Sequence, residues 1–407
     1  MLSNVSVLDV TQVVSGSFAS MNLADMGAEV VKIERPAGGD IGRSNPPHVG
    51  PYSSYYASVN RNKKSVSLNL KSDRGQSLFL ELAEKADVIV ENFTPGTMDE
   101  FGVGYDDVLD VNPEIIYCSI TGFGQDGPYS NYPALDIVAQ AMSGNMSITG
   151  PPSGRPYRAG MPIADIAGSM YAIQAILGAL IERNNVGEGQ HIDIAMLDAV
   201  ASWLTVRAGY TFGTGEAYPR MGNELDEFVP YGVFQTKDSY IAVVVVHDQQ
   251  WQKLCRVFGR EDLATDERFA TADARRKNRR QVREMLEQQL TEKTTKEWFH
   301  SLAERGIPAG PIYDTKEIWR DDHVNERGVR TEIELNGEPF PVIKTPIQTS
   351  RGIPGISNGV SQVGEESREK LAELGYEDSE IDSLIDNGVV GNPETAHPDR
   401  LEHTDST

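Results

Sequence analysis

Val5-Ser6-Val7-Leu8-Asp9-Val10, residues 17–26 and Glu29-Val30-Val31-Lys32-Ile33 follow one another as strand, helix and strand, and this pattern decides the fold. Gly27 stands after the helical stretch, where a glycine commonly ends a helix. Two strands that are joined through a crossover helix lie parallel in one sheet. The N-terminus therefore predicts a parallel sheet with helices packed on it.

The same alternation continues outward from this unit. It predicts strands at 65–70, 86–90, 114–120 and 191–196, and helices at 72–85, 105–111, 164–183 and through Trp203. Repeated strand and helix predict a doubly wound α/β domain, in which ligands collect outside the carboxyl ends of the strands.

The sequence changes character after about residue 210. A hairpin is predicted at 231–236 and 240–246, with helices at 249–258, 280–292 and 296–305 and a rigid turn at 306–311. We interpret 225–320 as a smaller α+β domain. Helices at 366–374 and 378–386 return to the first domain, and the polar residues from Gly391 onward predict a disordered tail.

Composition limits the possible partners. The 407 residues exceed the ~250–300 at which single cores stop growing, so at least two domains are expected. A formal net charge of −23 repels nucleic acid and anionic membranes, and favours a salt-loving source, where repulsion between carboxylates is screened. No apolar stretch reaches the ~20 residues of a membrane span, and no leader pattern is visible. We therefore expect a cytoplasmic protein that binds neither nucleic acid nor membrane.

Several familiar patterns carry little weight here. Residues 122–127 match a dinucleotide-binding fingerprint, but Pro128 follows where a helix should begin, and 355–359 match a nucleophile elbow without its strand and helix. The two cysteines lie in apolar contexts, without metal-ligand spacing, and predict buried thiols. Five cations at 275–280 are expected to pair with carboxylates such as Asp262, Asp266 or Glu284 rather than with a partner.

Cationic residues gather near the predicted strand ends. Arg35 follows the second strand, and Lys71 ends the run at 65–70, which Arg61, Lys63 and Lys64 precede. On an acidic chain, such a positive island predicts a phosphorylated, nucleotide-like ligand. The alternative is that each is an ordinary solvated charge.

Asp165 is the notable carboxylate. It lies in the apolar run Ile163-Ala164-Asp165-Ile166-Ala167, at the start of the long predicted helix. A poorly solvated aspartate has either a chemical task or a structural one, and a helix N-cap explains the position equally well. Both interpretations stay open from the residues alone.

These segments together resemble the class III CoA-transferase family, to which formyl-CoA transferase and carnitine CoA-transferase belong. The resemblance rests on motifs that extend to about residue 390: 8–16, 34–36, 62–65, 91–96, 121–124, 158–165, 187–190 and 306–311. It implies an interlocked homodimer whose Rossmann-like large domain covers 1–210 and 330–390. The inserted small α+β domain covers 225–320, between linkers at 211–224 and 321–329, and the tail is 391–407.

The resemblance also implies the site. Asp165 lies at the position of the family's nucleophilic aspartate. Positions that surround this nucleophile in the family correspond here to Val14, Ser15, Gly16 and Asp136. The CoA-binding positions correspond to Arg35, Leu68, Lys71, Asn92, Phe93 and Thr94. CoA thioester is then a substrate, with no tightly bound cofactor and no metal. Three features depart from formyl-CoA transferase: Val14 replaces a glutamine, Glu100 replaces an arginine, and a run of glycines is missing around 215–235.

The implied reaction moves CoA between carboxylic acids through an aspartyl anhydride and an aspartyl-CoA thioester, with amides near Gly16 or Gly160 stabilising each oxyanion. Succinyl-CoA and mesaconate are the expected pair. Citramalate, malate and oxalate with formate are alternatives, and Arg43, Arg207 or Tyr210 are candidates for the distal carboxylate. A related α-methylacyl-CoA racemase would need a histidine where Leu135 stands. A CoA-binding protein without catalysis is the third alternative.

Overall fold

The computed structural model describes residues 1–392. The chain forms two compact units. The first consists of Met1–Asn145, Arg158–Ala208 and the residues from Arg327 onward, and the second of Met146–Tyr157 and Gly209–Glu326.

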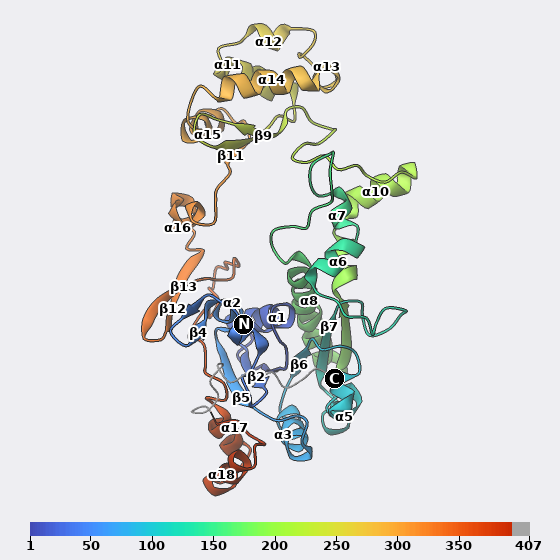
Figure 1. Cartoon of the computed structure of the whole chain (residues 1–407), viewed down its shortest axis with the longest axis vertical. Helices are drawn as coiled ribbons and strands as arrows, with labels where there is room; N and C mark the ends of the chain where they lie inside the picture. Colours follow the sequence, from blue (N-terminus) through green and yellow to red (C-terminus); the bar gives the residue numbers. More distant parts are fainter. Residues whose placement is uncertain (393–407) are drawn as a thin grey trace. The chain divides into compact units, whose positions relative to one another are not determined.

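A six-stranded parallel sheet forms the centre of the first unit (Figure 1). Its spatial order is β5-β2-β1-β6-β7-β8. The strands are β1 (Ser6–Asp9), β2 (Glu29–Glu34), β5 (Lys63–Ser67), β6 (Val88–Glu91), β7 (Ile116–Thr121) and β8 (Gln190–Ala195). Counted along the chain, this is the doubly wound order 3-2-1-4-5-6. The order reverses between β1 and β6, so a crevice is expected beyond their carboxyl ends.

Helices cover both faces of this sheet, as alternation along the strands requires. Val7 and Val30 belong to one buried cluster, whereas their neighbours Leu8 and Val31 belong to the other. The first face packs on α1 (Ser15–Asp25), α6 (Asp136–Met142), α8 (Ile163–Val186) and α9 (Met196–Ser202). The second packs on α3 (Asp73–Ala83), α4 (Thr97–Glu100), α5 (Tyr105–Val111), α17 (Ser367–Glu373) and α18 (Asp378–Asp386). The predicted α/β class with a parallel sheet is thereby confirmed.

Shorter elements complete the first unit. They are η1 (Ile41–Ser44), β3 (His48–Val49), β4 (Tyr52–Ser53), α2 (Ser54–Asn60), and the hairpin of β12 (Arg330–Leu335) and β13 (Glu338–Ile343). Helices α7 (Asn145–Ile148) and α10 (Thr205–Thr214) extend across the boundaries between the units.

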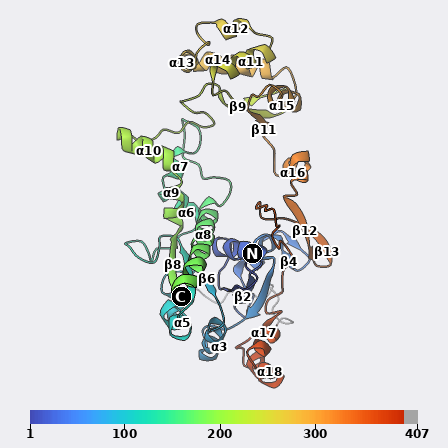
Figure 2. The same ribbon diagram turned by 180° about the vertical axis from the view of Figure 1, so that it is seen from behind.

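The second unit is a small α+β structure (Figure 2), and its buried hydrophobic residues form a core of their own. Its antiparallel sheet has the order β11-β10-β9, formed by β9 (Tyr231–Gln235), β10 (Tyr240–Val244) and β11 (Ala309–Pro311). The helical elements are α11 (Asp248–Val257), α12 (Asp262–Thr265), α13 (Ala272–Lys277), α14 (Arg279–Leu290), α15 (Thr295–Ala303), η2 (Glu317–Arg320) and α16 (Asp322–Glu326). Trp251 and Trp298 are fully buried in its core.

Two sequence expectations need correction. Residues 309–311 form an edge strand rather than only a turn, because proline is tolerated at a sheet edge. Helix α8 has the length and apolar composition of a membrane span, contrary to the expectation that no stretch has this length. Here it packs against β7, β8, α1 and α9 in the core of the first unit. At the C-terminus, the Gly391 amide donates to the Ser67 carbonyl at 3.2 Å, whereas 393–407 of the predicted tail lie outside the described residues.

Candidate active site

A cavity of about 440 Å³ opens at the carboxyl edge of the sheet, beside the point where the strand order reverses. Its walls come from the loops at 12–15, 92–95, 120–122 and 130–136, and from Asp165 on α8. We call it the Asp165 cavity. Of the residues implied by the resemblance, it gathers Val14, Ser15, Asn92, Phe93, Thr94, Asp136 and Asp165.

Asp165 lies in the first turn of α8, and it does not cap this helix. The N-cap residue is Pro162, and no side chain of that residue closes the turn. Within residues 1–392, no group hydrogen-bonds to the Asp165 carboxylate. Burial, followed by the negative charge of Asp136, raises its pKa from 3.8 to about 7. A poorly solvated carboxylate without a partner faces the cavity, as a nucleophile would require.

Asp136 performs the structural task that the sequence left open for Asp165. One oxygen accepts the Ala164 amide of α8 at 2.8 Å, and the other accepts Gln140 Nε2 at 2.7 Å. Gln140 is fully buried, and its Oε1 accepts the Ala159 amide at 2.9 Å. These bonds attach the segment before α8 to α6, so that the two carboxylates share one wall of the cavity.

The loop that joins β1 to α1 forms another part of the wall. Asn92 Nδ2 donates to the Gln12 carbonyl at 2.8 Å and to Ser15 Oγ at 3.0 Å, and Asn92 Oδ1 accepts the Gln12 amide at 2.8 Å. Asn92 therefore joins this loop to the end of β6. Gly16 follows this loop at the start of α1. A Cβ atom at this position would come within 2.1 Å of Thr11 Cγ2, so only glycine fits here. The first-turn amides of α1 have no intrahelical acceptors, and Ser15 lines the cavity.

A second cavity, of about 260 Å³, lies along the ends of β2 and β5. We call it the Arg35 cavity. It is lined by Arg35, Leu68, Lys71 and Phe93, and Gln12 and Phe93 line both cavities. Neither Arg35 nor Lys71 takes part in an ion pair with any described residue. Two exposed cations beside an apolar surface suit a phosphorylated ligand with an apolar body.

The prediction of a positive island is wrong for the three remaining cations, because each pairs with a carboxylate. Arg61 is buried and pairs with Asp25 at 2.7 Å, and Lys63 Nζ is buried 2.8 Å from Asp9 Oδ2. Lys64 pairs at the surface with Glu29 and Glu369. Successive residues of β5 point to opposite sides of the sheet, so adjacent lysines reach different partners.

Arg43, a candidate for binding the distal carboxylate of a substrate, does not line the Asp165 cavity. It is buried, its Nη2 lies 2.6 Å from Glu34 Oε1, and its guanidinium lies over the Tyr56 ring at 4.0 Å. Within the described residues, the lining of the Asp165 cavity contains no arginine, lysine or histidine. The two-base chemistry of a racemase therefore has no imidazole in this cavity.

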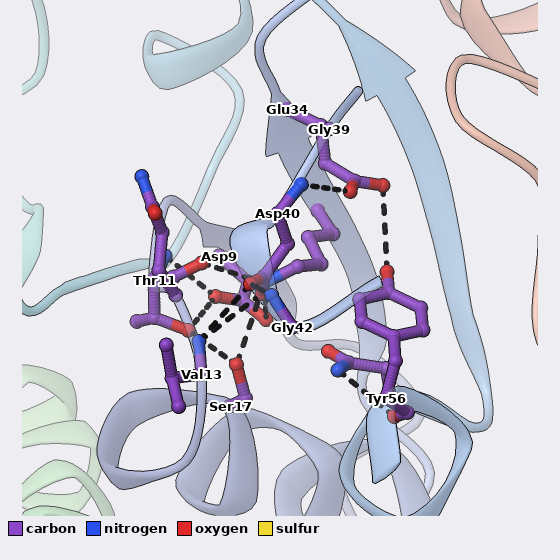
Figure 3. Close-up of polar contacts among 12 residues, drawn as sticks. Asp9, Thr11, Val13, Ser17, Glu34, Gly39, Asp40, Gly42 and Tyr56 are labelled. Carbon is purple, nitrogen blue, oxygen red and sulfur yellow. Dashed lines mark hydrogen bonds and ion pairs between the residues drawn. The ribbon is translucent and has the colours of Figure 1, made fainter. Parts of the chain in front are cut away.

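Sequence reasoning missed several residues of this region. Gln12 and Tyr132 line the Asp165 cavity. The pKa of Tyr55 on α2 is raised by burial and then by the charge of Asp165, which places its hydroxyl in the same electrostatic environment. Asp40 accepts the Val13 amide, as Figure 3 shows. The one sequence signal for Asp40 is its position after Gly38-Gly39, in the loop that follows a predicted strand.

Two minor predictions also have outcomes. Both cysteines are buried, and burial raises the pKa of each thiol, that of Cys255 to about 12. In the basic run, Arg280 pairs with Glu284 as predicted, whereas Arg275 pairs with Asp248. Asp262 and Asp266 instead pair with nearby arginines outside the run, Arg260 and Arg268.

The chain belongs to CoA-transferase family III, whose family model matches residues 2–366. It is therefore an enzyme of the class that transfers CoA. It is 38% identical to succinyl-CoA:glutarate CoA-transferase of Homo sapiens over 97% of this chain and 91% of that protein. It is 37% identical to succinyl-CoA:mesaconate CoA-transferase of Haloarcula marismortui over 92% of this chain and 97% of that protein. A CaiB/BaiF family protein from Brucella suis has a similar structure, with a TM-score of 0.85, 33% identity, and coverage of 91% of this chain and 98% of that one.

Proposed function

We propose that this enzyme transfers CoA from succinyl-CoA to a five-carbon dicarboxylate, mesaconate or glutarate, with Asp165 as the nucleophile. The observation that carries the proposal is an unpaired, poorly solvated carboxylate in a cavity beside a second cavity with two exposed cations. Relatives that are named for succinyl-CoA with glutarate or mesaconate support the substrate class.

The first half of the reaction cleaves the donor thioester. The Asp165 carboxylate forms a C–O bond to the thioester carbonyl, and the oxyanion that results collapses with cleavage of the C–S bond. CoA leaves as a thiolate and the acyl group remains as a mixed anhydride. The thiolate then attacks the Asp165 carbonyl of the anhydride, which releases the donor acid and leaves an aspartyl-CoA thioester.

The second half reverses these steps with the acceptor. The acceptor carboxylate attacks the aspartyl-CoA carbonyl and expels the thiolate, and the thiolate attacks the acceptor carbonyl of the new anhydride. The new acyl-CoA departs and the Asp165 carboxylate is restored. One thioester is formed for each one consumed, so no ATP is required.

Binding follows the two cavities. Arg35 and Lys71 hold the phosphates of CoA, and Leu68 and Phe93 contact its apolar parts. Asn92 and Thr94 line the Asp165 cavity, where the reactive end of the pantetheine arm belongs. Neutral donors such as Tyr132 and Gln12 are available there to the free end of the dicarboxylate.

The decisive experiment combines a substitution with a substrate screen. Asp165→Ala is expected to abolish CoA exchange, by on the order of 10⁴-fold or more, while folding and CoA binding persist. Asp198→Ala is the matched control, because Asp198 is an exposed aspartate in the first turn of α9 that does not line the cavity. Retained exchange in Asp165→Ala would show that the residue is structural.

The screen uses succinyl-CoA at high salt with mesaconate, glutarate, citramalate, malate, oxalate and carnitine. Exchange is expected to be fastest with mesaconate or glutarate, and no exchange onto either acid would refute the substrate assignment.

The proposal includes the interlocked homodimer that the family resemblance implies. Light scattering coupled to gel filtration should give twice the chain mass of 44.7 kDa.

A further inference from the structure

Val13 has a backbone conformation that its side chain disfavours. Its φ is +63°, in the left-handed region, where a β-branched residue is a genuine outlier. Such a conformation persists only where surrounding bonds hold it, and it commonly marks a functional site. Val13, Val14 and Ser15 form the wall of the Asp165 cavity that carries the start of α1.

Buried charged side chains hold this loop (Figure 3). Asp40 accepts the Val13 amide, at 3.1 Å to Oδ1 and 3.3 Å to Oδ2. Lys32 Nζ lies 3.1 Å from Asp40 Oδ2 and donates to the Thr11 carbonyl at 2.6 Å. Asp9 Oδ1 accepts the Thr11 amide at 2.9 Å. Thr11 and Val13 are therefore both fixed by charged side chains.

Asp40 is itself held rigidly. Its amide donates to Glu34 Oε2 at 2.8 Å, and its Oδ1 accepts the Gly42 amide at 2.8 Å as the N-cap of η1. Three buried carboxylates and three buried cations balance in this network: Asp9, Glu34, Asp40, Lys32, Lys63 and Arg43. Removal of one charge leaves a buried partner uncompensated, so the contacts depend on ionisation as well as on shape.

Asp40 also adjoins the Arg35 cavity. It lines that cavity, and Arg35 Nε donates to the carbonyl of the preceding residue, Gly39, at 2.8 Å. One carboxylate thus connects the loop that carries Arg35 to the loop that carries Val14 and Ser15.

We propose that Asp40, held by Lys32, is a positioning residue that fixes Val13 and so sets the Val14 and Ser15 amides to stabilise the oxyanion formed at Asp165. The inference rests on the proposed function. Oxyanion donors act at hydrogen-bond distance, and a misplacement of about 1 Å can cost on the order of 10²-fold in rate, so the bonds that fix Val13 bear on the next two amides. Such amides act on the transition state, so their misplacement lowers kcat rather than CoA affinity.

The test is the variant Asp40→Asn in the full-length enzyme. The asparagine oxygen in the Oδ1 position still accepts the Gly42 and Val13 amides, which Oδ1 of Asp40 accepts at 2.8 and 3.1 Å. The NH₂ group replaces Oδ2, where it faces two donors, Lys32 Nζ and the Val13 amide, and the charge that balances Lys32 is lost, so Lys32 and the Val13 loop must shift. We expect kcat to fall by about 10²–10³-fold, with the KM for acyl-CoA within about threefold of wild type. Lys32→Gln, which keeps a donor for Thr11, is expected to change the same parameters in the same direction. It also serves if Asp40→Asn does not fold.

Asp25→Asn is the matched control. Asp25 is equally buried and pairs with Arg61 at 2.7 Å, but it lies at the other end of α1 and lines neither cavity. It should lose thermal stability and keep kcat within about threefold of wild type. The positioning role is refuted if kcat falls no further in Asp40→Asn and Lys32→Gln than in Asp25→Asn, or if only KM changes.

Asp165→Ala separates the two proposals. Exchange that survives in Asp165→Ala refutes the proposed function, whereas an inactive Asp165→Ala beside a fully active Asp40→Asn refutes the positioning role alone.

Discussion

The charge of Asp136 should be visible in the pH dependence of the enzyme. In the proposed reaction Asp165 must be ionised to attack the thioester, and its pKa is raised to about 7, first by burial and then by Asp136. The activity kcat/KM should therefore fall about tenfold per pH unit below pH 7, with a plateau above. Asp136→Asn removes the second cause and leaves the first.

The size of the change follows from the order of the causes. Burial contributes more than Asp136 to the rise from 3.8 to about 7, so the acidic limb should move to lower pH by at most about 1.5 pH units. At pH 5.5, about 3% of wild-type Asp165 is ionised, and up to about half would be ionised in the variant. Relative to the plateau, kcat/KM at pH 5.5 should therefore rise by up to about 15-fold.

The assay is CoA exchange from pH 5 to 9 at constant ionic strength, with each profile scaled to its own plateau. Gln140→Met is the control, because it removes the hydrogen bond to Asp136 but keeps the Asp136 charge. Its limb should stay near pH 7 or move higher. A limb in Asp136→Asn that stays at the wild-type position, or moves to higher pH, would refute the assigned coupling between the two carboxylates.

Two further predictions concern the other charged groups. Lys71→Ala should raise the KM for acyl-CoA about tenfold, and less at high salt, because it removes an exposed cation that we propose binds a CoA phosphate. Lys64→Ala should leave this KM within about twofold of wild type, since Lys64 pairs with Glu29 and Glu369. Steady-state kinetics that rank the two lysines the other way would contradict the proposed phosphate site. Burial opposes the ionisation of Glu34, but the charge of Arg43 outweighs burial and holds the pKa of Glu34 well below 4.5. The ion pair therefore stabilises the fold fully above pH 4.5, and this stabilisation is lost as the pH falls through the lowered pKa. Urea unfolding should show that Glu34→Gln lowers the free energy of unfolding by about 3–5 kcal/mol at pH 7 and by less at pH 3. An equal loss at both pH values would count against the stabilising role of the Glu34–Arg43 pair.

The sequence predicted most of the regular structure because both faces of the sheet are buried. Strands of this kind are continuous apolar runs, and the helices between them are bounded by residues such as Gly27, so the pattern is strong over short windows. The hairpin of β12 and β13 was missed, although Asn336-Gly337 between its strands has the positive φ values typical of a hairpin turn.

The sequence by itself determined the α/β class and the family, and it singled out Asp165 as a candidate, because each depends on local pattern or on motifs in a fixed order. Only the tertiary structure decided which charges surround the site. Lys63 is 54 residues from Asp9 in the chain, and their contact exists because β5, β2 and β1 are neighbours. Asp136 rather than Asp165 accepts a first-turn amide of α8, because α6 and α8 pack together, and Asp40 accepts the Val13 amide from the loop after a neighbouring strand. Charged side chains reveal their partners only when the order of the strands is known, since a pairing across a sheet leaves no periodic signal in the sequence.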